Sequence, residues 1–193
     1  MKKITLIALV VCSAFAMQAC NSHKTSGSTD SATVTTDSSK TTVKTDSSAT
    51  AMPDTTFASK AAIGGMAEVA LGKMAAAKST NPQIKEFGNM MVMDHGKANA
   101  ELMSIAKTKN IMLPATLDAE HQAKSDSLSK LSGKDFDMAY VNTMIEGHKM
   151  TLALMQNEAK NGTDPDLKAF AAKTAPVVQQ HLDAINKIHG SLK

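Results

Sequence analysis

The chain has 193 residues, a length that suits one folded domain with additional flanking segments. Its 21 basic side chains are all lysine, its formal net charge is +3, and it contains one Tyr and no Trp. A nucleic-acid surface needs clustered cations and aromatic rings for stacking, so this composition argues against nucleic acid as a partner.

The first 19 residues are typical of a secretory signal peptide. A basic start at Lys2 and Lys3 precedes an apolar core at residues 4–11, which is about half the length that a membrane span needs. Small residues then lead to Cys20, where the apolar sequence stops and a polar segment begins. We therefore predict that the protein is exported.

Cys20 is the predicted site of a lipid anchor. Residues 17–20 resemble the lipobox of bacterial lipoproteins, although Met17 and Gln18 depart from its commonest form, and ordinary signal-peptidase cleavage after Ala16 is the alternative. We predict lipidation and anchoring in the cell envelope, at the outer membrane and facing the periplasm. The membrane is then the expected partner, and no protein partner is assigned.

The mature domain contains no thiol, because Cys12, the only other cysteine, leaves with the signal peptide. Disulfides and thiolate metal sites are thereby excluded from it. The segment from residue 20 to residue 53 is rich in Ser and Thr and has almost nothing apolar to bury, so it is predicted to be a disordered tether. The folded domain is predicted to span residues 54–193.

Helix-forming residues with three-four apolar spacing dominate the domain, and we find no convincing strand. The predicted long helices cover residues 56–79, 83–110, 134–161 and 165–190, and a shorter helix covers residues 116–131. Asn81-Pro82 separates the first two helices, and Asp164 with Pro165 starts the last one. The fold class is therefore all-α.

The connections predict the topology. Each pair of long helices is joined by about three residues and forms an antiparallel hairpin. At about 1.5 Å per residue, the short helix at residues 116–131 spans ~24 Å, enough to carry the chain back along the bundle. We expect this crossover, which makes a ferritin-like four-helix bundle with an extra short helix between the second and third long helices. If the short helix only caps one end, the second and third long helices are antiparallel instead.

Each long helix has an apolar stripe that one titratable residue interrupts near its middle: Glu68, His95, His148 and His181 respectively. Counted from the connecting loops, the groups lie at heights that agree within ~2 Å in the first hairpin and ~6 Å in the second. The four side chains are therefore expected to meet in one layer of the bundle.

A buried carboxylate needs a partner or a metal ion, and three imidazoles with one carboxylate make a nitrogen and oxygen site for Zn, Fe, Mn or Cu. Asp94, Asp137 and Tyr140 are candidates for supporting the ligands. The alternative is a hydrogen-bonded Glu–His network that plugs the core without a metal.

A dinuclear iron centre of the usual kind is disfavoured, because it uses Glu-x-x-His motifs. The positions three residues before the candidate histidines hold Val92, Ile145 and Val178. The chain also lacks a glycine-framed serine elbow and a nucleotide-binding loop, so no catalytic residue is assigned and an enzyme is the least favoured class.

The domain also resembles the DUF4142 family of bacterial envelope proteins over about residues 55–189. The matching pieces, in chain order, are Ala67-Glu68-Val69 with Leu71-Gly72, residues 91–95, Phe136-Asp137 with Tyr140, residues 144–148, and Pro176 with His181-Leu182. The resemblance implies an exported, often lipid-anchored, ferritin-like bundle, and it implies no activity.

Two functions follow as hypotheses. In the first, the protein is an envelope lipoprotein that handles metal or protects against stress, using the buried Glu and His layer. In the second, it is a non-catalytic structural or interaction module of the envelope, and the polar layer only fixes the helix register.

Overall fold

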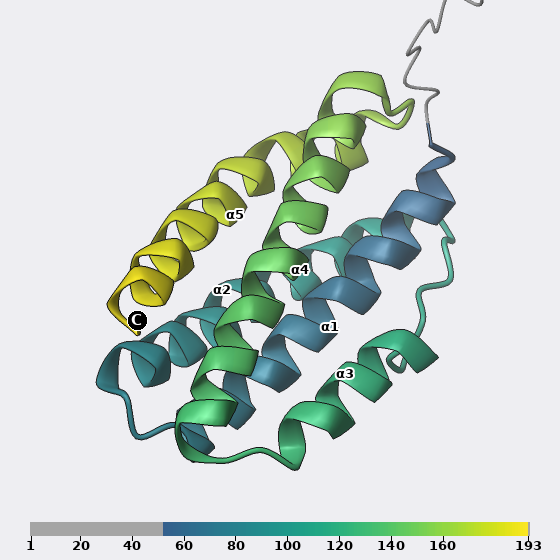
Figure 1. Cartoon of the computed structure of the whole chain (residues 1–193). Coiled ribbons are helices and arrows are strands. Elements are labelled where there is room, and N and C mark those ends of the chain that lie inside the picture. The colour runs from purple at the N-terminus through teal and green to yellow at the C-terminus, as the bar shows by residue number, and fades with distance from the viewer. Residues whose placement is uncertain (1–51, 193) are drawn as a thin grey trace, which may run out of the picture. The chain divides into compact units, whose positions relative to one another are not determined.

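The computed structural model describes residues 52–192, and helices joined by loops make up this part of the chain (Figure 1). The predictions for the signal peptide, for Cys20 and for nearly all of the tether lie outside the described residues. Five helices follow one another along the chain: α1 (Asp54–Lys78), α2 (Pro82–Thr108), α3 (Ala119–Ser129), α4 (Gly133–Asn161) and α5 (Pro165–Ser191). The all-α prediction is confirmed for residues 52–192, which contain no strand.

The helix ends follow from the residues that the sequence places there. Asn81 accepts a hydrogen bond from the backbone N–H of Gln83, with Pro82 in the first turn of α2. Asp164 accepts bonds from the N–H groups of Asp166 and Leu167 at the start of α5. These side chains satisfy backbone donors that have no partner inside the helix, so the predicted boundaries of the long helices agree with the structure to within two residues.

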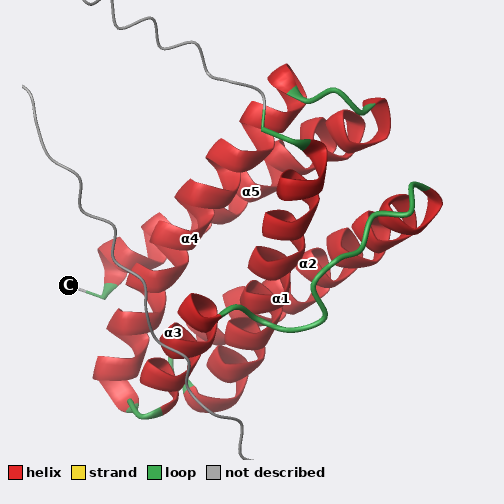
Figure 2. Ribbon diagram, turned by 90° about the vertical axis from the view of Figure 1, so that its right-hand side faces the viewer, coloured by secondary structure: helices red, strands yellow, loops and turns green. Residues whose placement is uncertain are grey.

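The short helix is shorter than predicted. Asp118 caps it by accepting a hydrogen bond from the N–H of His121, so α3 begins at Ala119 and not at residue 116. Its 11 residues span only ~16 Å. An irregular segment at residues 109–118 makes the rest of the connection, running back from the end of α2 to α3 (Figure 2).

The two hairpins, α1–α2 and α4–α5, pack side by side, with α1 against α4 and α2 against α5. The start of α2 and the start of α4 share one apolar cluster, through Ile84 and Tyr140, whereas the ends of the same helices share the other, through Leu102 and Met155. Helices α2 and α4 are therefore parallel. The connection through α3 is a crossover, as expected, and not a cap at one end.

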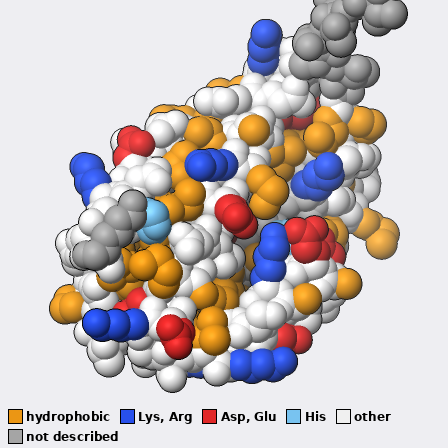
Figure 3. Space-filling model, in the orientation of Figure 1, with side chains coloured by type: hydrophobic (Ala, Val, Ile, Leu, Met, Phe, Trp, Pro, Cys, Tyr) orange, Lys and Arg blue, Asp and Glu red, His pale blue; other side chains and the backbone are white. Residues whose placement is uncertain are grey.

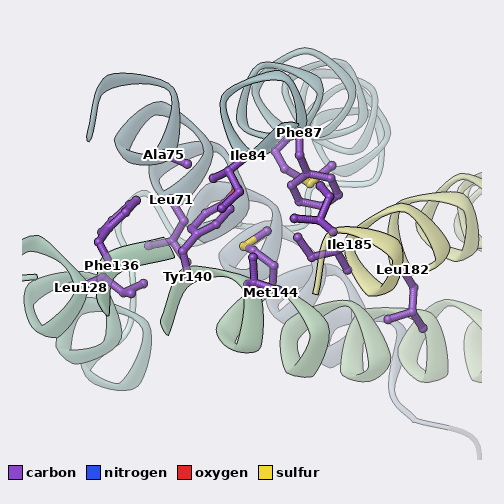
Figure 4. Packing of buried hydrophobic residues seen from close by; sticks show 13 residues of the cluster. Leu71, Ala75, Ile84, Phe87, Leu128, Phe136, Tyr140, Met144, Leu182 and Ile185 are labelled. Atoms are coloured by element: carbon purple, nitrogen blue, oxygen red, sulfur yellow. The ribbon is translucent and has the colours of Figure 1, made fainter. Parts of the chain in front are cut away.

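The hydrophobic core is divided into two clusters. One cluster gathers Leu71, Phe87, Tyr140 and Ile185 from the four long helices, together with Leu128 of α3, and its side chains point toward one another (Figure 4). The other cluster lies at the opposite end of the helices, around a pair of Phe rings, Phe57 and Phe170. In each long helix the polar residue predicted from its stripe lies between the residues of the two clusters.

The surface is of mixed character. Lysine and acidic side chains are scattered among hydrophobic ones on the face shown in Figure 3, and neither sign of charge forms a large patch there. No helix within residues 52–192 combines the length and the apolar character that a membrane span requires.

Candidate metal centre

The structure brings the four predicted polar residues together in the middle of the bundle. Glu68 of α1 and His95 of α2 are each 5 % exposed, His148 of α4 is fully buried, and His181 of α5 is 2 % exposed. The expectation of a single polar layer is therefore met. Buried groups of this kind need hydrogen bonds, opposite charges or a metal ion to compensate for lost water.

The three histidine rings surround a common point. Their centroids are 5.6 Å apart for His95 and His148, 5.2 Å for His95 and His181, and 5.5 Å for His148 and His181. One ring nitrogen from each lies within 4.8 Å of the others, and within residues 52–192 this is the only such group of metal-binding side chains. Three nitrogens bound to zinc at ~2.0–2.1 Å lie ~3.4 Å apart, so the rings would close by at most ~1.4 Å around an ion.

One nitrogen of each ring already has a partner. Nδ1 of His95 lies 2.8 Å from Oε2 of Glu68. Nδ1–H of His148 donates to the backbone oxygen of Met144 at 2.8 Å, and Nε2–H of His181 donates to Oδ2 of Asp94 at 3.1 Å. The second nitrogen of each ring, Nε2 of His95 and His148 and Nδ1 of His181, is buried and has no hydrogen-bond partner.

Electrostatics divide the three histidines into two kinds. Burial opposes charge on both Glu68 and His95, but their mutual attraction prevails and lowers the pKa of Glu68 while it raises the pKa of His95. Burial lowers the pKa of His148, and it lowers the pKa of His181 to about 4 despite the bond to Asp94. Glu68 therefore favours the charged form of His95, whereas burial favours the neutral forms of His148 and His181, which carry a lone pair on the free nitrogen.

Glu68 stands behind the histidines. Its Oε2 faces His95, and its Oε1 accepts a hydrogen bond from the hydroxyl of Thr151 at 3.3 Å and lies 3.8 Å from Nδ1 of His148. Both His contacts involve the nitrogens that point away from the unpartnered ones. The carboxylate therefore orients the rings from the α1 side.

Of the three predicted supporting residues, only Asp94 bonds to a site histidine, and that histidine is His181 and not its neighbour His95. Tyr140 is fully buried between the rings of Phe136 and Phe87, and its hydroxyl has no hydrogen-bond partner. Burial, together with the charge of Glu68, raises the pKa of this phenol above its usual value, so it stays protonated. Asp137 is buried, and its Oδ1 has no partner in the structure.

Three contacts in the layer were missed in the sequence. Thr151 is one helical turn after His148, which is a detectable spacing, but a Thr at the edge of a stripe is common. The carbonyl of Met144 is a backbone group that no residue type announces. Phe87 looked like an ordinary core residue, but its ring centroid lies 5.9 Å from that of His148 and 6.4 Å from that of His181.

A further buried acid, Glu158, lies near the C-terminal end of α4 and was also missed. It is 1 % exposed, and neither carboxyl oxygen has a partner that meets hydrogen-bond geometry. Burial, reinforced by the neighbouring carboxylate of Asp54, raises its pKa to about 7. This group lies in the last turn of α4, beside Gly162, and takes no part in the histidine layer.

The sequence and the fold both have relatives. The family described as "Domain of unknown function (DUF4142)" matches residues 39–188. Its match begins inside the segment predicted as tether and includes the whole polar layer. No curated protein matches the chain.

Solved structures share the fold at low sequence identity. A DUF305 fragment from Deinococcus radiodurans has a TM-score of 0.65 and 12 % identity, with 74 % of this chain and 99 % of that chain covered. CopM in its Cu(II)-bound form has a TM-score of 0.64 and 16 % identity, with the same coverage. CopM in its Cu(I)-bound form has a TM-score of 0.62 and 14 % identity, covering 72 % of this chain and 97 % of that chain. At these identities the likeness establishes the fold alone.

Proposed function

The chain belongs to the DUF4142 family, and from this premise and the geometry of the histidine layer we propose that it is a metal-handling protein. One transition-metal ion would be bound by Nε2 of His95, Nε2 of His148 and Nδ1 of His181, which come from α2, α4 and α5. A fourth position would be left for water or another small ligand.

The observation that carries this proposal is the state of the six ring nitrogens. Three are buried without partners, in a cluster where one nitrogen of each ring lies within 4.8 Å of the others. The other three each lie 2.8–3.1 Å from an oxygen atom, as a hydrogen bond for His148 and His181 and as a close contact with Oε2 of Glu68 for His95. This is the arrangement in which outer hydrogen bonds fix the tautomer and the direction of metal-binding histidines. A network that served only to plug the core would use both nitrogens of each ring, because unpaired buried polar atoms are costly.

The donor set limits the metal. Imidazole nitrogens suit Zn, Cu and Fe, whereas Mn, Mg and Ca prefer oxygen ligands, so Mn is the least favoured of the four predicted metals. In this proposal Glu68 and Asp94 support the ligands and do not bind the ion, which refines the predicted role of Glu68. The Cu-bound forms of CopM support the proposal to the extent that a bundle of this shape accommodates a transition metal.

The proposed cellular setting comes from the sequence. The signal-like residues 1–19 and Cys20 support an exported lipoprotein of the outer membrane, facing the periplasm, in which the domain handles metal or protects against stress. A Cys20→Ala variant is expected to lose incorporation of labelled palmitate and to leave the membrane fraction. Retention of label by the variant would contradict lipidation at this residue.

We further propose that the bundle is of the ferritin-like kind. Its support is the parallel arrangement of α2 and α4, with one long crossover that contains α3. The site would then be a mononuclear variation on a bundle that elsewhere uses two carboxylate-bridged metals.

The test is metal analysis of the purified protein, followed by calorimetric titration with Zn²⁺ after chelator treatment. The wild-type protein is expected to bind one ion, and His148→Ala is expected to bind at least ~100-fold more weakly because one of three ligands is gone. His121→Ala is the matched control, since His121 is bonded to Asp118 on α3, away from the layer. Absence of stoichiometric binding in the wild-type protein would leave the structural or interaction module as the function.

A further inference from the structure

The charges around the histidine layer carry an inference that rests on the proposed metal site and deepens it. Two carboxylates lie directly behind the ligands, Glu68 behind His95 and Asp94 behind His181. Behind His148 is the neutral carbonyl of Met144. Among the salt bridges of residues 52–192, these two carboxylates pair only with histidines of the layer and not with any lysine.

Ion binding changes the net charge of this layer. Each imidazole that binds through its free nitrogen keeps its other N–H toward its oxygen partner and is itself neutral. The layer then carries two negative charges, those of Glu68 and Asp94. A divalent ion neutralises both, whereas a monovalent ion leaves one negative charge uncompensated in a layer where Glu68 and the three histidines are at most 5 % exposed and the side chain of Asp94 is 33 % exposed. Uncompensated charge is strongly unfavourable at the depth of Glu68 and less so at Asp94, which water partly screens.

We propose that the site formed by His95, His148 and His181 selects a divalent transition-metal cation over a monovalent one such as Ag⁺. The donor chemistry acts in the same direction. Soft monovalent ions favour thiolate and thioether sulfur, and the three converging ligand atoms are all imidazole nitrogens. Selectivity therefore arises from carboxylates that do not touch the metal.

The test compares Zn²⁺ and Ag⁺ in the wild-type protein and in Glu68→Gln, at pH 7.5. Glutamine keeps the size of Glu68 and can accept the N–H of His95, so the change removes charge with little change in shape. The attraction of a carboxylate for an ion is twice as large for a divalent as for a monovalent cation. We expect the Zn²⁺ affinity to fall ~100-fold and the Ag⁺ affinity only ~10-fold, so the preference for Zn²⁺ falls ~10-fold.

The readout is the set of imidazole NMR resonances, because Ag⁺ also binds exposed thioethers, and the described part of the chain has exposed methionines at positions 93, 103, 112 and 150. Glu158→Gln is the matched control, since it neutralises a buried acid outside the layer and should change neither affinity. Asp94→Asn should act in the same direction as Glu68→Gln but less strongly, because Asp94 is one-third exposed.

The outcomes separate this inference from the proposed function. If Zn²⁺ and Ag⁺ shift the three histidine rings with equal affinity, or if Glu68→Gln weakens both ions by the same factor, the divalent selectivity is wrong and the metal site stands. If neither ion shifts the rings, the metal site itself is wrong. Tighter Zn²⁺ binding with unequal losses in Glu68→Gln supports both.

Discussion

At the scale of single residues, the histidine layer makes the metal-free protein sensitive to acid. Burial lowers the pKa of His181 to about 4, against 6.5 for an unhindered histidine. Between these values the unfolded chain binds a proton that the folded protein excludes, so stability is present above pH 6.5 and is lost as the pH falls toward 4. In the presence of chelator, we expect the free energy of unfolding to fall by up to ~3 kcal/mol over this range, as measured by urea denaturation.

The control for this prediction is His181→Gln, whose side-chain amide can still donate to Asp94 but does not titrate. Its stability should fall less steeply between pH 6.5 and pH 4 than that of the wild-type protein. The slope should not vanish, because the pKa of His148 is lowered in the same direction. Equal slopes in the two proteins would contradict the assignment of a buried neutral His181.

Glu158 should have the opposite dependence on pH. Its raised pKa, about 7 against 4.5, means that the folded protein holds a proton that the unfolded chain releases. Stability is therefore present below pH 4.5 and is lost as the pH rises through 7. We expect Glu158→Gln to be more stable than the wild-type protein at pH 8.5 by about 1–3 kcal/mol in urea denaturation, and to lose this advantage at pH 5.

A matched control for Glu158 is Glu146→Gln, which removes an exposed carboxylate from the same helix. It should change stability by less than ~0.5 kcal/mol at both pH values. If Glu158→Gln is no more stable than the wild-type protein at pH 8.5, burial does not raise the pKa of this carboxyl.

Some of these buried polar residues could be predicted from the sequence and others could not. His95, His148 and His181 could be predicted because each interrupts an apolar stripe near the middle of its helix. Glu158 could not, since its burial depends on the turn to Gly162, where an added Cβ would lie within 2.6 Å of the carboxyl carbon of Glu158 and closer still to Oε1. The position of the ring nitrogens relative to Glu68 depends on side-chain rotamers, which periodicity does not specify.

At the scale of elements, α1 and α2 owe their close packing to a pair of glycines. A Cβ added to Gly72 would lie 2.6 Å from the backbone oxygen of Gly88 and 2.9 Å from Cβ of Met91. These are backbone and near-backbone atoms, so the helices would have to separate. We expect Gly72→Ala to lower the free energy of unfolding by about 1–3 kcal/mol, despite the better helix propensity of Ala.

Gly96 provides the comparison, because a Cβ added there meets nothing within 4 Å. Gly96→Ala should raise the free energy of unfolding by up to ~1 kcal/mol, through helix propensity alone. Differential scanning calorimetry of the two variants measures both effects. Stabilisation of similar size in both would show that the hairpin does not depend on close approach at Gly72.

Helix type and helix ends were predictable because apolar spacing, Pro and cap residues act locally. The start of α3 was predicted three residues too early, because Asp118, whose side chain caps the helix, was not identified as its start. The end of α2 is also determined by local residues. Asn110 adopts φ 56°, and the N–H of Ile111 returns to the carbonyl of Ala106, which terminates the helix. The sequence left open whether α2 and α4 are parallel or antiparallel, and the contacts between the two hairpins decide that they are parallel.

At the scale of the whole molecule, the polar layer lies where the two hairpins meet. Each hairpin packs more extensively within itself than against the other, and the layer separates the two apolar clusters. The proposed ligands cross this interface, because His95 belongs to the first hairpin and His148 and His181 belong to the second. A bound ion would therefore join the two hairpins at their weakest contact.

This arrangement predicts where a metal stabilises the protein. A ligand that binds only the folded state adds ~2.7 kcal/mol to the free energy of unfolding when its concentration is 100 times Kd. Because the ion joins the hairpins, amide exchange should slow on all four long helices after Zn²⁺ addition, including α1, which supplies no ligand. Helix α3 supplies no ligand and contributes only Leu128 to the buried core, so its exchange should change least and it serves as an internal comparison in the same experiment. Protection confined to the turns around the three histidines would mean that the ion binds without coupling the two halves of the bundle.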